Sequence, residues 1–136
     1  MQIIPYLTFA GDCAEAFRFY EEALEGEIQA LLPFEGNPGC EEMPAEWRDK
    51  VLHACLKVGD FLLMGSDPPP QMRRQPAGIS VNLNVETPAE AERVFQALSE
   101  GATVHMPLGE TFWAQRFGML TDRYGTPWMV NCSKPG

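Results

Sequence analysis

The sequence predicts an α+β fold in which two βαβββ modules form a curved eight-stranded sheet around a groove. The two modules are expected to be copies of one supersecondary unit. Two observations carry this prediction. The segment that starts at Asp12 is repeated loosely from Thr87, 75 positions later. Each half also places one amphipathic helix after its first strand and ends in a predicted hairpin. A repeat of about half the chain length indicates a duplicated unit rather than a solenoid. We expect one domain, with modules at residues 1–66 and 79–136 joined by residues 67–78.

The first module is expected to begin with a strand and a helix. Residues 3–10 form a run of apolar and β-branched side chains, which is typical of a strand. Asp12 is placed to cap the following helix, and Glu15, three residues later, completes the sequence pattern of a capping box. The helix is expected to run to about Leu24, with Gly26 as the residue that ends it.

The rest of the first module is predicted to contain strands and one long loop. Gly59 and Asp60 form a tight turn signal between two of the strands. The segment from Phe34 to Asp49 is rich in proline, glycine and acidic residues, so we predict a loop or short helix there, and a candidate lid over a cleft. The predicted strands are residues 27–33, 51–58 and 61–65.

The second module is expected to repeat this order after a proline-rich connection. The consecutive prolines Pro68–Pro70 cannot belong to the interior of a sheet. Thr87 and Glu90 have the spacing of a capping box around a helix start, and Gly101 is expected to end that helix. The predicted strands are residues 79–86, 102–106, 115–122 and 127–132.

Composition limits the class of partner. Ten Lys and Arg residues against 19 Asp and Glu residues give a formal net charge of −9, which argues against nucleic acid and anionic membrane surfaces as partners. No apolar stretch is long enough to span a bilayer, and the first residues lack the pattern of a secretory signal. We therefore expect a cytoplasmic protein.

The cysteines do not indicate a metal site. No two of them form a Cys-x-x-Cys pair, and no Cys/His cluster has zinc spacing. Cys13 lies at a predicted helix start, where a thiol can be activated, but we interpret it as a small buried apolar side chain. The four cysteines are Cys13, Cys40, Cys55 and Cys132.

Several short motifs suggest a family. They are Ala16-Phe17-Arg18-Phe19-Tyr20, Met64-Gly65-Ser66-Asp67, Phe112-Trp113-Ala114-Gln115-Arg116-Phe117-Gly118 and Asp122-Arg123-Tyr124-Gly125-Thr126-Pro127-Trp128. Together with the order of elements, they resemble the vicinal oxygen chelate superfamily, which includes glyoxalase I, bleomycin- and fosfomycin-resistance proteins and extradiol dioxygenases. Within it, the sequence most resembles the PhnB-like, or demethylubiquinone-methyltransferase-like, family. This resemblance covers nearly the whole chain and implies a homodimer.

The resemblance also identifies positions where related proteins bind a metal. In those proteins, one side chain from the first strand and one from the last strand of each module hold the ion. At the repeat spacing of 75 residues, the sequence offers Pro5, Ser80, Met64 and Met129 at these positions. None is a usual ligand of a divalent metal. We therefore expect no metal and no cofactor, and nothing in the sequence resembles the nucleotide-cofactor site of a methyltransferase.

Ligand-binding candidates follow from this placement. Ser80 is expected to face the groove, and alternation along the strand places Asn82 and Asn84 on the same face; the alternative is that this face is simply solvated. Trp113 and Gln115 are expected to form a pocket wall, or Trp113 a dimer contact. The full set of ligand-binding candidates is Leu7, Ser80, Asn82, Trp113, Gln115 and Met129.

Catalytic candidates are fewer. Histidine changes charge near neutral pH, so His53 is a candidate acid/base; the alternative is a half-exposed strand histidine that bonds to a neighbour. Glu110 and Asp67 are lone loop carboxylates, and Glu110 is kept as the second candidate. Loop carboxylates of an acidic protein are usually solvated.

Two functions from different classes are compatible with these residues. The first is metal-independent binding of a small polar or aromatic molecule in the groove. The second is a lyase or isomerase that uses a divalent metal, or His53 or Glu110 as acid/base. A purely structural dimer partner is a third possibility, favoured if side chains fill the groove.

Overall fold

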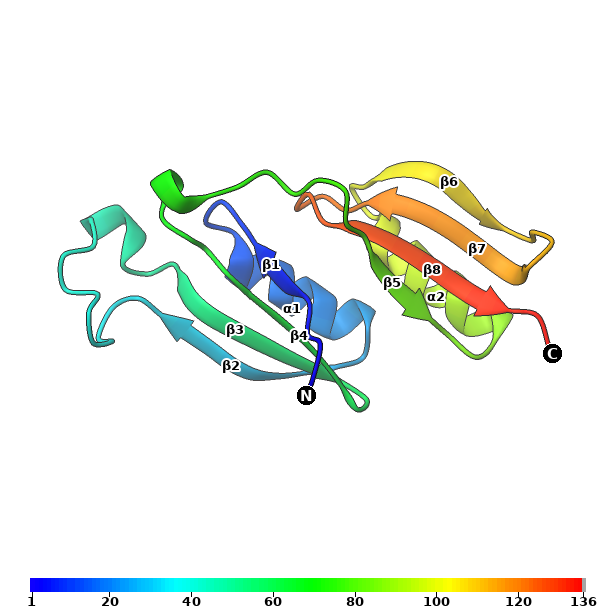
Figure 1. The fold of residues 1–136 in the computed structure, drawn as a ribbon, viewed down its shortest axis with the longest axis horizontal. Coiled ribbons are helices and arrows are strands. Elements are labelled where there is room, and N and C mark those ends of the chain that lie inside the picture. Colours follow the sequence, from blue (N-terminus) through cyan, green and yellow to red (C-terminus); the bar gives the residue numbers. More distant parts are fainter. Residues whose placement is uncertain (136) are drawn as a thin grey trace. The chain divides into compact units, whose positions relative to one another are not determined.

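The computed structural model describes residues 1–135. The chain divides into two compact units, Met1–Gln75 and Pro76–Gly136. Each unit contains one helix and one four-stranded sheet, with the elements in the order β-α-β-β-β (Figure 1). This confirms the predicted α+β class and the duplicated βαβββ order. Within the described residues, no helix combines the length and the apolar character needed to cross a bilayer.

The sheet of the first unit has the strand order β1-β4-β3-β2. Strand β1 runs parallel to β4, and the other neighbours are antiparallel. Two single turns of 3-10 helix, η1 (Ala45–Trp47) and η2 (Pro70–Met72), lie in the long loop and in the connection. The main elements are β1 (Tyr6–Thr8), α1 (Cys13–Ala23), β2 (Glu27–Pro33), β3 (Val51–Val58) and β4 (Phe61–Ser66).

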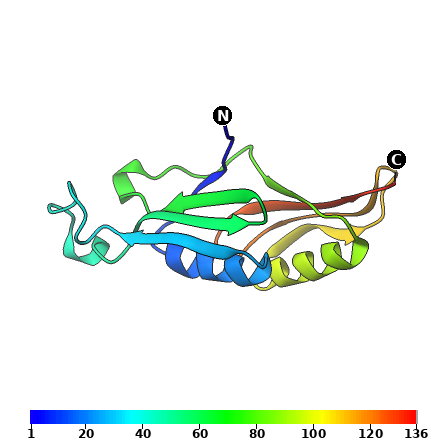
Figure 2. The same cartoon turned by 90° about the horizontal axis from the view of Figure 1, so that it is seen from below.

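Helix α1 covers one face of this first sheet (Figure 2). Its Phe17 and Tyr20 side chains are fully buried. A Cβ atom on Gly65 of β4 would lie 2.8 Å from the Phe17 ring, so the strand needs glycine where the helix crosses it. Leu7 pairs with Gly65 and Tyr6 with Met64. Leu7 therefore faces the helix and Tyr6 faces the opposite side of the sheet.

The second unit repeats this arrangement with the strand order β5-β8-β7-β6. Helix α2 buries Phe95 and Leu98 against its sheet, and a Cβ atom on Gly118 would lie 2.7 Å from the Phe95 ring. Trp128 and Val130 of β8 are almost fully buried. The elements are β5 (Val81–Asn84), α2 (Pro88–Ser99), β6 (Thr103–Gly109), β7 (Ala114–Thr121) and β8 (Pro127–Ser133).

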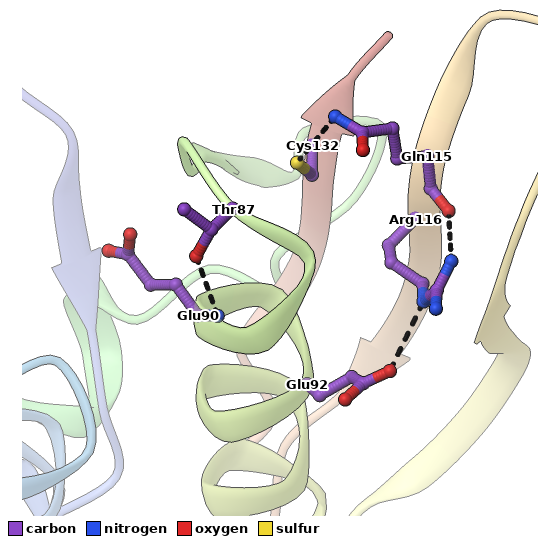
Figure 3. A network of polar contacts seen from close by, with 6 residues as sticks. All are labelled: Thr87, Glu90, Glu92, Gln115, Arg116 and Cys132. Atoms are coloured by element: carbon purple, nitrogen blue, oxygen red, sulfur yellow. Dashed lines mark hydrogen bonds and ion pairs between the residues drawn. The ribbon is translucent and has the colours of Figure 1, made fainter.

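The two helices begin in different ways. Thr87 caps α2 as predicted, because its Oγ1 accepts a hydrogen bond of 3.1 Å from the backbone N–H of Glu90 (Figure 3). Asp12 occupies the cap position of α1 but makes no side-chain capping bond. Instead, the Asp67 carboxylate accepts the backbone N–H groups of Gly11 at 2.8 Å and Cys13 at 3.1 Å. The predicted capping box of α1 is wrong.

The end of α1 differs from the prediction, whereas the end of α2 agrees with it. Glu25, and not Gly26, adopts a left-handed conformation after α1, with φ of 53°. Gly26 is required for another reason: a Cβ atom there would lie 2.7 Å from the carbonyl oxygen of Lys57. After α2, Gly101 itself is left-handed, with φ of 73°.

A β-bulge is repeated in both sheets. In β2, the pairing shifts between Ile28 and Ala30, so one extra residue lies opposite β3. In β6, the pairing shifts in the same way between Val104 and Met106. The numbers of these residues differ by 76. The duplication is therefore visible in an irregular feature as well as in the order of elements.

The strand registers correct the spacing of the first strands. Tyr6 pairs with Met64 in one sheet, and Asn82 pairs with Met129 in the other. Tyr6 and Asn82 are therefore the equivalent positions, 76 residues apart rather than 75. The linker between β1 and α1 is one residue longer than the linker between β5 and α2. Consequently, the expected pair of Pro5 and Ser80 is out of register by one residue.

Candidate functional site

In each unit, the sheet face opposite the helix is called here the open face. On the second sheet, Asn82 pairs with Met129, and Asn84 pairs with Asn131. Gly118 pairs with Val130 beneath the Phe95 ring, which places Val130 on the helix side. Since side chains alternate along a strand, Met129 and Asn131 lie on the open face, together with Asn82 and Asn84.

Three of these side chains form a hydrogen-bonded amide network, which we call the asparagine network: Asn82, Asn84 and Asn131. Asn84 Oδ1 accepts hydrogen bonds from Asn82 Nδ2 at 3.3 Å and from Asn131 Nδ2 at 3.0 Å. Asn131 Nδ2 also donates to Ser133 Oγ at 3.1 Å. Asn131 Oδ1 is buried and has no hydrogen-bond partner among the described residues.

Apolar and aromatic side chains lie beside this network. Met119 pairs with Met129, and Phe117 pairs with Asn131, so both belong to the same open face. The Trp113 and Phe117 rings pack edge to face with their centroids 5.3 Å apart. Trp113 remains 45% exposed. The open face therefore combines oriented amides with an apolar surface that can support a flat ligand.

Gln115 is held by the protein itself. Its Nε2 donates to the carbonyl oxygen of Ser133 at 2.9 Å and approaches the Cys132 sulfur at 3.7 Å, a contact drawn in Figure 3. Its neighbour Arg116 points to the helix side, where its Nε donates to Glu92 at 3.2 Å (Figure 3). Arg116 is thus a structural partner of α2 and does not contribute a charge to the open face.

The open face of the first sheet contains His53. The Tyr6 hydroxyl and His53 Nδ1 are 3.3 Å apart, and the two ring centroids are 5.9 Å apart. Tyr6 reaches His53 across β4, because β4 lies between β1 and β3. A half-exposed histidine bonded to a phenol fits both the structural and the acid/base interpretation.

Two carboxylates differ in their surroundings. Glu110 is exposed and forms an ion pair with Lys134 Nζ at 3.4 Å. Asp67, expected to be a solvated loop carboxylate, is fully buried, and its Oδ2 accepts the backbone N–H of Val51 at 3.0 Å. That expectation for Asp67 is wrong, because the carboxylate holds three backbone segments together.

The Cys13 thiol is not an activated nucleophile. Burial raises its pKa well above the ordinary range, and the negative charges of Asp67 and Asp12 raise it further. The thiol therefore stays protonated, in agreement with the interpretation of Cys13 as a buried apolar side chain.

The residues at the positions where the resemblance implies metal ligands are poor ligands of a divalent cation. In the observed register, the first and last strands present Tyr6 and Met64 in one sheet and Asn82 and Met129 in the other. Thioethers suit only soft metals, and a neutral amide or phenol is a weak ligand. The described part of the chain also contains no group of three or more His, Cys, Asp or Glu residues that could hold a metal.

Two of the ligand-binding candidates are placed differently from the expectation. Leu7 faces α1, because it pairs with Gly65 under the Phe17 ring, so Tyr6 replaces it on the open face. Ser80 is exposed and precedes the first residue of β5. Asn82, Met129, Gln115 and Trp113 all belong to the second unit.

Asn131 was missed from the sequence. Alternation from Met129 would have identified it, because the two residues are two positions apart in β8.

Comparisons with known proteins identify the family. A family model described as 3-demethylubiquinone-9 3-methyltransferase matches residues 1–131. YjdN of Escherichia coli is 31% identical over 142 residues, which cover 98% of this chain and 97% of that protein. The crystal structure of PA1353 from Pseudomonas aeruginosa is 52% identical, covers 99% of both chains and superposes with a TM-score of 0.90.

Two further solved structures with lower sequence identity have a similar fold. A putative 3-demethylubiquinone-9 3-methyltransferase, PhnB protein, from Bacillus cereus is 28% identical, covers 98% of this chain and all of its own, and has a TM-score of 0.78. The bleomycin-binding protein of Streptomyces verticillus shares the fold, with a TM-score of 0.59 at 20% identity over 98% of this chain and 97% of that one. The chain therefore belongs to the PhnB-like, 3-demethylubiquinone-9 3-methyltransferase family and has the fold of the glyoxalase and bleomycin-resistance superfamily.

Proposed function

We propose that this protein binds a small polar or aromatic molecule on the open face of its second sheet, without a metal. The observation that carries the proposal is the asparagine network beside Met129 and Phe117. Ligand sites combine an apolar lining with a few oriented polar groups, and this face has both. The Streptomyces verticillus protein of the same fold is a bleomycin-binding protein, so binding alone is a plausible task for the fold.

The proposal does not need a metal, because the family's metal positions carry poor ligands. Tyr6, Met64, Asn82 and Met129 offer a phenol, two thioethers and an amide. Elemental analysis of protein purified without a histidine tag tests this part. Stoichiometric zinc, nickel, iron or manganese would overturn it.

Titration of a metabolite library tests binding. We expect a compact polar or aromatic compound to bind, and Asn131→Ala to weaken that binding at least tenfold. Gln96→Ala is the matched control, since it removes an exposed amide from α2, on the other side of the same sheet. Binding that is unaffected by Asn131→Ala, or the absence of any ligand below millimolar concentration, contradicts the proposal.

A second candidate function is acid/base catalysis by a lyase or isomerase. The contact between Tyr6 and His53 favours His53 over Glu110, because Glu110 is exposed and paired with Lys134. If a substrate screen detects turnover, His53→Gln should abolish it and Tyr6→Phe should reduce it. Glu110→Gln should have no effect. Turnover that survives His53→Gln excludes this role.

The description of the family names a methyltransferase. We infer that the residues of this chain give methyl transfer no support, because nothing in the sequence resembles a nucleotide-cofactor site. Incubation with radiolabelled S-adenosylmethionine and candidate acceptors tests this inference. Transfer of label to any acceptor would overturn it.

We also infer a homodimer in the cytoplasm. Val104 and Met106 of the edge strand β6 are each 42% exposed, and a second copy of the chain could cover such apolar side chains. Light scattering should give about twice the chain mass of 15.2 kDa. Val104→Lys is expected to lower that mass toward the monomer value, and an unchanged monomer mass in the wild type contradicts the inference.

A further inference from the structure

We propose that the ligand is a neutral planar molecule whose edge carries a hydrogen-bond donor next to an acceptor, as in a primary carboxamide, a lactam or an imide. This proposal rests on the proposed function, because it names the class of molecule that the open face of the second sheet would bind. It follows from the hydrogen-bonding capacity, the rigidity and the charge of that face.

The asparagine network leaves one amide oxygen and one amide nitrogen without a partner at its exposed edge. Asn84 Oδ1 accepts from both neighbours, Asn82 and Asn131. Asn82 Oδ1 and Asn84 Nδ2 then have no partner among the described residues, and both side chains are exposed. Reversing all three amides together preserves the bonds and still leaves one unpartnered amide nitrogen and one unpartnered amide oxygen at this edge. A carboxamide, lactam or imide has the complementary pair.

The network is anchored at its inner end. Asn131 is tied to Asn84 and to Ser133 Oγ, so the exposed amides have little freedom to turn. The buried Asn131 Oδ1 has no partner among the described residues, and such an unsatisfied polar group destabilises the fold. Native proteins keep few such atoms, and departures from good packing concentrate at functional positions. Rigid, pre-oriented amides lose less entropy when a ligand binds.

The described side chains beside the asparagine network carry no formal charge; farther along the same face, His105 Nε2 lies 2.8 Å from Thr121 Oγ1. The described residues that the strand registers place beside the network are methionine, phenylalanine and threonine: Met119, Met129, Phe117 and Thr121. A chain with a net charge of −9 has many acidic residues elsewhere, and Arg116 is directed to the helix side by Glu92. An anionic ligand would find no cation here, and a cationic ligand would find no carboxylate. The face therefore selects a neutral molecule.

The apolar part of the face favours a flat ring. Met129 lies opposite Asn82, and Met119 lies opposite Met129, so two thioether side chains extend sideways from the exposed amides. Methionine adapts to the shape of a partner and makes favourable contacts with aromatic rings. A planar ring on Met129 and Met119 can place its amide edge against Asn82 and Asn84.

Three probes that share one ring test this inference: benzamide, benzoate and N,N-dimethylbenzamide. Benzamide is neutral and offers a donor and an acceptor, benzoate is an anion without a donor, and the dimethyl compound cannot donate. Amide and methionine-methyl NMR spectra locate the binding site of each probe. We expect benzamide to shift the side-chain signals of Asn82, Asn84 and Met129, and the other two probes to bind at least tenfold more weakly.

Variants at the exposed edge complete the test. Asn82→Ala combined with Asn84→Ala should abolish the preference for benzamide, whereas Gln96→Ala should leave it unchanged. If library compounds shift this face but benzoate or the dimethyl probe binds as well as benzamide, the inference fails and the proposed function stands. If no compound shifts the face, for example because a second copy of the chain covers it, both fail.

Discussion

The Asp67 carboxylate accepts a hydrogen bond from the backbone N–H of Cys13, 54 positions earlier in the chain. The same side chain binds the N–H groups of Gly11 and Val51, and the Asp67 carbonyl oxygen accepts Trp47 Nε1 at 3.1 Å. One residue thus fixes the start of α1, the start of β3 and the position of η1. Asp67 is the organising residue of the first unit.

Loss of the Asp67 carboxylate should therefore destabilise the protein strongly. Asp67→Ala leaves three backbone N–H groups without their acceptor, and we expect a loss of about 3–5 kcal/mol in the free energy of unfolding. Asp12→Ala should cost less than about 0.5 kcal/mol, because the Asp12 side chain makes no capping bond. Denaturation by urea measures both. Equal decreases in the free energy of unfolding for the two variants would contradict the role assigned to Asp67.

Two glycines should resist replacement because a helix packs directly on them. Gly65→Ala places a methyl group 2.8 Å from the Phe17 ring, and Gly118→Ala places one 2.7 Å from the Phe95 ring. We expect each change to cost about 1–3 kcal/mol through overpacking. Gly109→Ala is the control, since its nearest neighbour would be 4.0 Å away and its φ is not left-handed. Thermal unfolding of the three variants tests this order.

Cys13 should make stability fall at alkaline pH. Its pKa is raised in the folded state by burial, then by Asp67 and Asp12, so the folded state favours the protonated thiol. The resulting stabilisation is complete below about pH 8.5, where the thiol of the unfolded chain ionises, and is lost as the pH rises above that value. Cys13→Ala should lose less stability than the wild type between pH 8 and pH 10. An equal decrease in the free energy of unfolding for both proteins over this pH range would contradict the prediction.

Thiol labelling gives a second test of the cysteines. Cys13, Cys55 and Cys132 are buried, whereas Cys40 is partly exposed. Iodoacetamide at pH 8 should label Cys40 in the native protein and all four cysteines after denaturation. Mass spectrometry of the labelled peptides distinguishes the two patterns, and rapid native labelling of Cys13 would contradict its protonated, buried state.

The ion pair between Arg116 and Glu92 should contribute little to stability. Its side chains are 35% and 59% exposed, and exposed pairs contribute at most about 1 kcal/mol. Glu92→Gln should therefore change the free energy of unfolding by less than about 0.5 kcal/mol, and the small difference should shrink further in high salt. A large decrease in the free energy of unfolding, measured by urea denaturation, would contradict this prediction.

The sequence predicted the fold because the signals for its elements are local. Alternation, turn residues and helix periodicity depend on neighbouring residues, so the order of strands and helices and most of their bounds agree with the structure. The Thr87 cap was predictable for the same reason. The role of Asp67 was not predictable, because only the folded chain brings its partners Gly11, Cys13 and Val51 close to it.

The candidate site was predicted in part. Asn82 and Asn84 share one sheet face, as alternation along the strand predicts, and Met129 lies beside them. Trp113 precedes β7 and packs against Phe117 of this face. Leu7 was assigned to the wrong face because the repeat was aligned through its helices, and the linker before α1 is one residue longer. A shift of one residue exchanges the two faces of a strand, so a small error in spacing moves Leu7 from solvent to helix.

The repeated bulge has a consequence for solubility. Strands β2 and β6 each form the long edge of their own sheet, and each has a bulge and one proline, Pro33 or Pro107. The opposite edges, β1 and β5, are only three and four residues long. Bulges, prolines and short strands all hinder the addition of a foreign strand. Since the bulge occurs in both halves at matching places, both sheets are protected in the same way against fibril-like association.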